Sequence, residues 1–271
     1  MQVARTLVAF LCLTVSLGAV AQGTASDSQE VKGEVAKKLN NAIADLTSVP
    51  FQNNWDYGIG PANAQHYQLN FQPVIPFHLS EDWNLISRTI VPIHSLQSPI
   101  PGGSTTSGLG DITQSLFLVP RSKTAHGWMW GVGPVLLYPT ASHDELGTGK
   151  WAAGPTFIVI KQDAHGFTYG MLVNQLWSFA GWGTSAVNML FLQPGFGYTV
   201  KKTYTTLAAD TETSYDWKKE QWTVPINVYL TQVLKVKSQI FSVQFGYRYY
   251  AHKPEGGPNH GLRATLTLVF L

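Results

Sequence analysis

The second half of this chain and much of the first are built from short segments in which apolar and polar side chains alternate. In "IFSVQFGYRYY" (240–250), Phe241 and Val243 alternate with Ser242 and Gln244. A period of two is that of a β-strand, whose successive side chains point to opposite faces of the sheet. This pattern restricts the fold to sheets that separate an apolar environment from a polar one.

About twelve such segments follow Pro50, most of them roughly ten to fourteen residues long. They cover residues 53–59, 66–78, 83–95, 109–119, 128–138, 150–160, 166–178, 188–199, 203–215, 221–233, 239–251 and 261–271. Tight connectors alternate with longer loops rich in Gly and Pro, which is typical of an up-and-down barrel in an outer membrane. The sequence therefore predicts an all-β, antiparallel transmembrane barrel of about 12 strands over residues 51–271, with both termini at the short-turn side.

The composition of the two rows distinguishes such a barrel from a soluble sandwich, whose outward row would be charged. Here the polar row consists of Gln, Asn, Ser, Thr and Gly, and charged residues make up 13% of the chain. Soluble domains contain about 25%. Seven of the nine tryptophans fall near expected strand ends, as in the aromatic girdles of membrane proteins. These seven are Trp83, Trp128, Trp130, Trp151, Trp177, Trp217 and Trp222.

The N-terminus has the features of an export signal. Arg5 precedes an apolar run from Leu7 to Leu17, and a small-residue cleavage site ends at Ala21. We therefore expect residues 1–21 to be removed and the mature chain to reach the bacterial outer membrane. The single cysteine, Cys12, lies in this run, so the mature chain would contain no thiol or disulfide.

Residues 22–50 are expected to form an amphipathic helix and a linker. Between Ser28 and Thr47, apolar residues recur at helical spacing with charged residues between them. Three placements are open for this helix: packed on a protein surface, inserted in the barrel as a plug, or lying on a membrane.

Prolines stand inside or near several expected strands, although a proline cannot donate to the hydrogen-bond ladder. They are Pro73, Pro76, Pro92, Pro134, Pro155, Pro194 and Pro225. One interpretation places them at bulges or near the rims. The other is that Pro134, Pro155 and Pro194 interrupt strand pairing and open a lateral path from the lumen into the bilayer.

Seven charged residues are candidates for the barrel lumen. They are Asp56, Arg88, Asp111, Asp210, Glu212, Arg248 and Arg263. An arginine on the lipid face near the midplane costs about 2–4 kcal/mol, so the arginines should point inward or lie near a rim. These charges either cross-link the wall from inside or line a water-filled constriction that sets solute preference.

Motifs of catalysis and of cofactor binding are missing from the sequence. It contains no GxSxG, no HExxH and no phosphate-binding glycine loop, and its eight histidines lack the close spacing of metal ligands. The histidine in "PIHSLQSP" (92–99) is not followed by the Ser-Asn-Gly of outer-membrane phospholipases. The net charge of +2 gives no reason to expect a nucleic-acid partner. We predict a protein that is not an enzyme and holds no cofactor or metal.

An ordered set of motifs resembles a known family. They are "FQNNWDYGIGP" (51–61), "LNFQPVIPF" (69–77), "EDWNLISRTIVPI" (81–93), "SGLGDI" (107–112), "WGVGPVLLYPTA" (130–141), "GTGKWAAGP" (147–155), "YDWKKEQWTVPINV" (215–228) and "PEGGPNHGLR" (254–263). The chain resembles bacterial outer-membrane transporter-like proteins of the phenol-degradation (MetA-pathway) family, some of which are mislabelled neuromedin U. The resemblance implies an outer-membrane barrel and a role in the uptake of aromatic or other hydrophobic compounds.

These observations predict a channel or facilitator for passive uptake of small, hydrophobic or aromatic molecules. Its expected partners are outer-membrane lipid, a small-molecule solute and the barrel-assembly machinery, and its oligomeric state is left open. The alternatives are a structural or adhesion barrel without transport, a soluble periplasmic β protein and, least favoured, an outer-membrane hydrolase.

Overall fold

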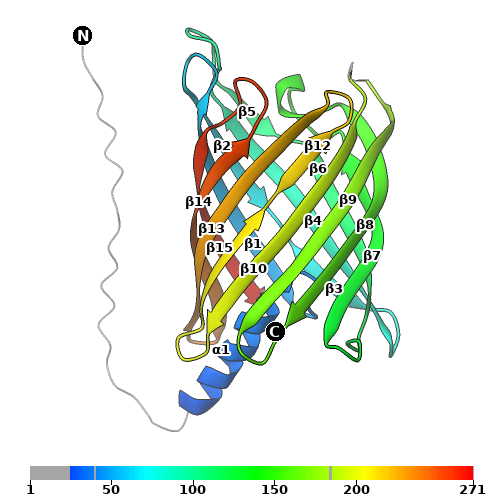
Figure 1. Ribbon diagram of the computed structural model, residues 1–271, viewed down its shortest axis with the longest axis vertical. Helices are drawn as coiled ribbons and strands as arrows, with labels where there is room; N and C mark the ends of the chain where they lie inside the picture. Colours follow the sequence, from blue (N-terminus) through cyan, green and yellow to red (C-terminus); the bar gives the residue numbers. More distant parts are fainter. Residues whose placement is uncertain (1–24, 40, 183–184, 271) are drawn as a thin grey trace, which may run out of the picture.

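The chain closes into one antiparallel β-barrel, drawn in Figure 1. The computed structural model describes residues 25–39, 41–182 and 185–270, so the predicted leader, 1–21, lies outside the described residues. The last strand, β15 (His260–Phe270), pairs with the first, β1 (Thr47–Ile59), and the sheet therefore has no free edge. The predicted fold class is confirmed.

The barrel has twelve strand positions around its circumference, which we call staves. Nine of them are continuous strands, and three consist of two strands separated by a break. The continuous ones are β1, β4 (Trp83–Leu96), β7 (Trp128–Tyr138), β8 (Lys150–Gln162), β9 (Phe167–Gly181), β10 (Asn188–Val200), β13 (Gln221–Val236), β14 (Gln239–His252) and β15. The divided ones are β2 (Ala64–Phe71) with β3 (Val74–His78), β5 (Thr106–Leu109) with β6 (Ile112–Pro120), and β11 (Thr205–Thr211) with β12 (Thr213–Asp216).

The three interruptions correct the prediction of continuous strands over 66–78, 109–119 and 203–215. In the first, Pro73 has no N–H to donate, and pairing is lost between Phe71 and Val74. In the third, Glu212 separates β11 from β12 at the point where Pro194 of the facing strand β10 lacks a donor. The backbone N–H that Pro194 of β10 lacks thus coincides with a break in the neighbouring stave, between β11 and β12.

The helix α1 (Ala25–Leu39) is shorter than the one predicted over 28–47. Residues 41–46 form turns, in which the Asn41 side chain accepts a hydrogen bond from the backbone N–H of Ile43 (3.1 Å). Thr47 then pairs with Phe270, so the strand begins inside the segment that was expected to be helix and linker. Among the described residues, no helix is long and apolar enough to cross a membrane.

The two ends of the barrel differ in their connectors. The two longest loops, 97–105 and 139–149, lie at one end together with the loop 253–259, and we call this the long-loop end. At the other, the short-turn end, lie the tight turns together with α1 and the end of β15 (Figure 1). The loop 139–149 contains the short 3₁₀ helix η1 (Asp144–Leu146).

The two faces of the wall carry different side chains, as the alternation predicts. On β14, Phe245 and Tyr249 are 67% and 56% exposed on the outer face, whereas Ser242 and Arg248 are buried on the inner face. The expected aromatic girdles are present at both ends: Trp83 packs edge-on against Trp130 near the short turns, and Tyr138 against Trp151 near the long loops. Aromatic rings at these levels are typical of membrane–water boundaries.

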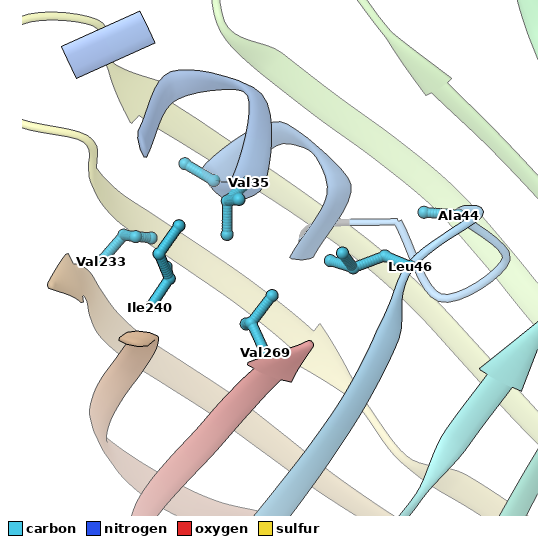
Figure 2. Packing of buried hydrophobic residues seen from close by; sticks show 7 residues of the cluster. Val35, Ala44, Leu46, Val233, Ile240 and Val269 are labelled. Atoms are coloured by element: carbon cyan, nitrogen blue, oxygen red, sulfur yellow. The ribbon is translucent and has the colours of Figure 1, made fainter. Parts of the chain in front are cut away.

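Apolar packing inside the barrel is concentrated at the short-turn end. One cluster consists of Val35, Ala36, Ala44, Leu46, Val233, Ile240 and Val269. Figure 2 shows Val35 of α1 above the inward-pointing side chains of Val233, Ile240 and Val269, with Ala44 and Leu46 beside them. A second cluster surrounds Ile43 with Ile86, Phe117, Val119, Ile158, Ile160 and Leu172.

Candidate functional site: the barrel lumen

Six of the seven charged candidates meet inside the barrel, and we call them the charge belt. They are Asp56 on β1, Arg88 on β4, Asp210 on β11, Glu212 between β11 and β12, Arg248 on β14 and Arg263 on β15. Each lies in the row of side chains that faces the lumen. This was expected for the arginines, because a guanidinium on the lipid side would be unsolvated. Three acids and three arginines make the belt formally neutral.

Glu212 is the centre of the belt. Its Oε2 accepts hydrogen bonds from Nη2 of Arg263 (2.7 Å) and from Nη2 of Arg248 (3.3 Å). Arg248 Nη1 lies 3.6 Å from Oδ2 of Asp56, and Arg263 Nε donates to Oδ1 of Asn54 (2.7 Å). Two arginines on neighbouring strands are thus joined to a carboxylate at the break between β11 and β12, so that the belt cross-links β1, β14 and β15 to that break from inside.

A glycine makes room for one member of this network. Gly261 pairs with Asp56 across β1 and β15, and a Cβ at Gly261 would collide with Oδ1 of Asp56. A larger residue at this position would displace the carboxylate from Arg248. Because Gly261 lacks a side chain, Asp56 can turn into the lumen toward Arg248.

Asp210 and Arg88 extend the belt to opposite walls. Asp210 accepts hydrogen bonds from the side chains of Asn227 (2.7 Å), Gln193 (3.2 Å) and Tyr229 (3.2 Å). Arg88 donates from Nη2 to Oε1 of Gln72 (3.0 Å), and the charges of Glu212 and Asp210 act on it. Since β4 and the β11–β12 stave lie on opposite sides of the barrel, the belt spans the lumen.

Asp111 does not join this network. Its carboxylate lies at the break between β5 and β6 and accepts hydrogen bonds from the backbone N–H of Ala141 (3.1 Å) and from the backbone N–H (2.5 Å) and hydroxyl (2.8 Å) of Thr148. Asp111 therefore holds the two ends of the loop 139–149. The alternation of side chains predicted that Asp111 faces the lumen, but it did not predict the hydrogen bonds of Asp111 to the loop 139–149.

The helix α1 and residues 41–46, which we call the plug segment, cover the short-turn end of the lumen. The apolar side chains of the plug segment take part in both interior clusters. The side chain of Gln162 on β8 donates a hydrogen bond to the carbonyl oxygen of Lys37 (2.6 Å), and the amide of Asn41 contacts the sulfur of Met129 (3.2 Å). Of the three placements open for the predicted helix, the structure supports the plug.

A cavity of about 320 Å³ lies between the charge belt and the plug segment. Arg88, Gln193 and Asp210 border it on the belt side, whereas Leu39 and Leu46 border it on the plug side. We call this space the lumenal cavity. The interior at this level is hollow rather than filled by side chains, so it can hold a small molecule.

Two histidines that are far apart in sequence meet in the lumen near the long-loop end. Nε2 of His66 lies 2.9 Å from Nδ1 of His94, and the two rings stack with centroids 5.0 Å apart. The spacing of the histidines in the sequence did not predict this pair, which the register of β2 and β4 brings together. Among the described residues, no group of three or more potential metal ligands is found.

The neighbouring Ser95 does not form a catalytic pair with His94. Its hydroxyl accepts a hydrogen bond from the hydroxyl of Ser107 (3.0 Å), in the row of β4 opposite to the one that carries His94. Successive side chains of a strand point to opposite faces, so His94 cannot act as the base for Ser95.

The three candidate lateral-opening prolines coincide with gaps in strand pairing. Pro134 of β7 stands directly opposite Pro155 of β8. Pairing of β7 with β6 is interrupted at Gly133 and Pro134, and pairing of β8 with β9 at Gly154 and Pro155. Pro194 of β10 lies beside the gap that contains Glu212.

Comparisons with known proteins agree with this architecture. No protein-family model matches the chain. No curated protein matches it in sequence. The chain is similar in structure to the COG4313 outer membrane channel from Pseudomonas putida F1, with 17% sequence identity and a TM-score of 0.62 over 83% of this chain and 94% of that one.

Two porins are more distant. The NanC porin has 11% identity and a TM-score of 0.49 over 82% of this chain and 99% of that one. The KdgM porin has 12% identity and a TM-score of 0.47 over 83% and 99%. At these identities, the comparison with the Pseudomonas protein establishes the fold alone: this chain has the fold of a bacterial outer-membrane β-barrel.

Proposed function

We propose that the protein is a passive channel or facilitator of the bacterial outer membrane for small, hydrophobic or aromatic molecules. In this proposal a cleaved leader at 1–21 directs export, the barrel-assembly machinery inserts residues 51–271 together with the start of β1, and the short-turn end faces the periplasm. The family resemblance of the motifs is part of the same proposal, and the similarity in fold to an outer membrane channel of Pseudomonas putida F1 is consistent with it.

The observation that carries the proposal is the lumenal cavity. A barrel that served only as a scaffold or an adhesin would gain stability from a packed interior. Here a hollow space of about 320 Å³ is retained between two barriers, the charge belt and the plug segment. Such a narrow, obstructed lumen favours small solutes and slow passage over free diffusion of large hydrophilic ones.

Two routes out of the lumen are compatible with this geometry, and we propose the lateral one for apolar solutes. Strand pairing is interrupted at Pro134 and Pro155 and beside Pro194, where the ladder lacks donors. An apolar molecule that leaves there enters acyl chains directly and does not have to pass the plug segment. The charges of the belt would then set which solutes can continue along the axis.

Uptake by intact cells tests the proposal. A strain that lacks the protein should take up a small aromatic compound more slowly than the same strain carrying the wild-type chain, whereas uptake of a large hydrophilic sugar should be equal in both. Intact cells are required because apolar solutes cross simple phospholipid vesicles unaided. Equal uptake of the aromatic compound by both strains would favour a structural or adhesion barrel.

The lateral route has a separate test in the same cells. Replacing Pro134, Pro155 and Pro194 by Ala restores three backbone donors and should slow uptake of the aromatic compound. The matched control is Pro101→Ala in the exposed loop 97–105, which should leave uptake unchanged. If the triple variant folds and transports at the wild-type rate, the solute does not leave through this part of the wall.

A further inference from the structure

We propose that the lumenal cavity is a binding site for an uncharged amphipathic molecule that carries a hydroxyl or similar neutral polar group on one edge. This inference rests on the proposed channel function, because it takes the lumen as the route of the solute, and it defines the class of that solute more closely. The argument depends on which groups of the cavity wall are already paired.

The cavity has one polar wall, formed by β1, β13, β14 and β15. Hydroxyl groups of Ser48, Ser242 and Thr267 border it there, beside Thr231 and Thr265. Thr231 and Thr265 are already paired, since Thr231 accepts a hydrogen bond from Gln244 Nε2 and Thr265 donates one to Gln244 Oε1, each over 3.1 Å. Two of the five hydroxyls of the polar wall are thus hydrogen-bonded within the protein.

The other three hydroxyls are not satisfied by the protein. Ser48, Ser242 and Thr267 are 8%, 4% and 7% exposed, and their hydroxyls make no hydrogen bond to any residue that the structure describes. Their oxygens are not among the side-chain atoms that are fully shut off from solvent, so they open into the cavity. Three such groups on adjacent strands, all bordering one cavity, are positioned to bind the polar edge of a guest molecule.

The facing wall is apolar and unusually flat. Gly170 of β9 pairs with Gly195 of β10, and Gly197 follows in the same inward row. The surface continues through Ile158, Ile160 and Leu172. Because three inward positions lack side chains, the wall recedes here and leaves space for a ring or a short alkyl chain.

The charges that border the belt side of the cavity are one arginine and one aspartate, which together offer an ion no net attraction. Arg88 is held by Gln72, Asp210 by three donors, and Lys38 by Glu34 (2.9 Å). A charged guest would lose part of its hydration here, while Arg88 and Asp210, which carry opposite charges, would attract and repel it at the same time. A volume of about 320 Å³ lies at the lower end of the range for small-molecule sites.

A matched pair of probes tests the inference: 4-bromobenzyl alcohol and 4-bromotoluene, which differ by one hydroxyl. Their affinities are measured by calorimetry on the detergent-solubilised full chain. In the variant Ser242→Ala/Thr267→Val, which keeps the shape of the wall, the ratio of the alcohol's affinity to that of bromotoluene should fall by about fivefold or more, the value of one or two lost hydrogen bonds. Comparing ratios cancels partition of the probes into detergent.

A cavity-filling variant provides the second measurement. Ala208→Leu places extra carbon atoms in the cavity and should abolish saturable binding of both probes, whereas Ala209→Leu, in the outward row of β11, should not. Bromine anomalous scattering from soaked crystals should locate the alcohol between β9 and β14. Binding that survives Ala208→Leu, or a ratio unaffected by loss of the hydroxyls, would overturn the inference.

The outcomes separate this inference from the proposed function. If cells take up aromatic compounds through the protein but the two variants bind the probes like the wild type, the channel function stands and the binding site is refuted. If both variants change binding as expected but deletion of the protein leaves uptake unchanged, the site stands and the transport function fails.

Discussion

Replacing Glu212 by Gln should destabilise the barrel and change the ion selectivity of its lumen. The Glu212 carboxylate oxygen Oε2 accepts hydrogen bonds from both Arg248 and Arg263. Arg248 and Arg263 keep their charges in the variant, so both buried guanidiniums lose the carboxylate that neutralises them. Removing one partner of a buried ion pair costs about 3–5 kcal/mol, and the free energy of unfolding should fall by that amount.

The same substitution removes one of three acids that face three arginines, so the belt gains a net charge of +1. Planar-bilayer recordings under a salt gradient should then show a reversal potential shifted toward anion selectivity. Urea unfolding followed by tryptophan fluorescence measures the stability. The matched control is Glu255→Gln, in the exposed loop 253–259, which should change neither quantity. Unchanged stability together with unchanged selectivity would refute the cross-linking role of Glu212.

Two further predictions concern the plug segment and the outer face. Val35→Asp buries a carboxylate in the apolar cluster at the short-turn end, so it should release α1 and speed tryptic cleavage after Lys37 and Lys38, whereas Glu255→Gln in the exposed loop 253–259 should not. Equal cleavage rates would show that the cluster does not hold the plug. Leu230→Arg, on the lipid face of β13, should cost about 2–4 kcal/mol in unfolding measurements, against about 0–1 kcal/mol for Val236→Arg at the rim. Equal costs at both positions would mean that depth in the bilayer does not govern this face.

The alternation of side chains predicted most of the fold, because it is a local property of each strand. The row of Phe245, Tyr247 and Tyr249 faces outward and Arg248 inward, as expected from spacing alone. The twelve staves follow from counting such segments between turns. The end of the helix was missed because residues 41–46 are shaped by burial of Ile43 and Leu46 against distant strands, and helical spacing carries no information on those contacts.

The lumenal site was predicted only in part. Spacing indicates that Asp56, Asp210 and Arg263 point inward, but it does not specify which charges meet, since that depends on the register of strands up to about two hundred residues apart. Asp111 stands in a similar pattern and instead holds a loop. The break at Glu212 arises from Pro194 on the neighbouring strand, so no local signal marks it.

The His66–His94 pair was missed for a related reason. The two residues are 28 positions apart, and they meet because β2 and β4 are neighbouring staves that pair in an offset register. A search for closely spaced histidines cannot find such a pair. Aligning the expected strands as neighbours and comparing their inward rows would have provided the missing signal.

The central claim of this account is that the charge belt and the plug segment close the lumen in series. Single-channel conductance of the wild type, of Glu212→Gln, of Val35→Asp and of the double variant tests it most directly. Because two barriers in series each limit the current, each single variant should raise the conductance slightly, and the double variant should raise it by more than the sum of the two. A wild-type conductance as large as that of the double variant, or a full increase from one substitution alone, would contradict the claim.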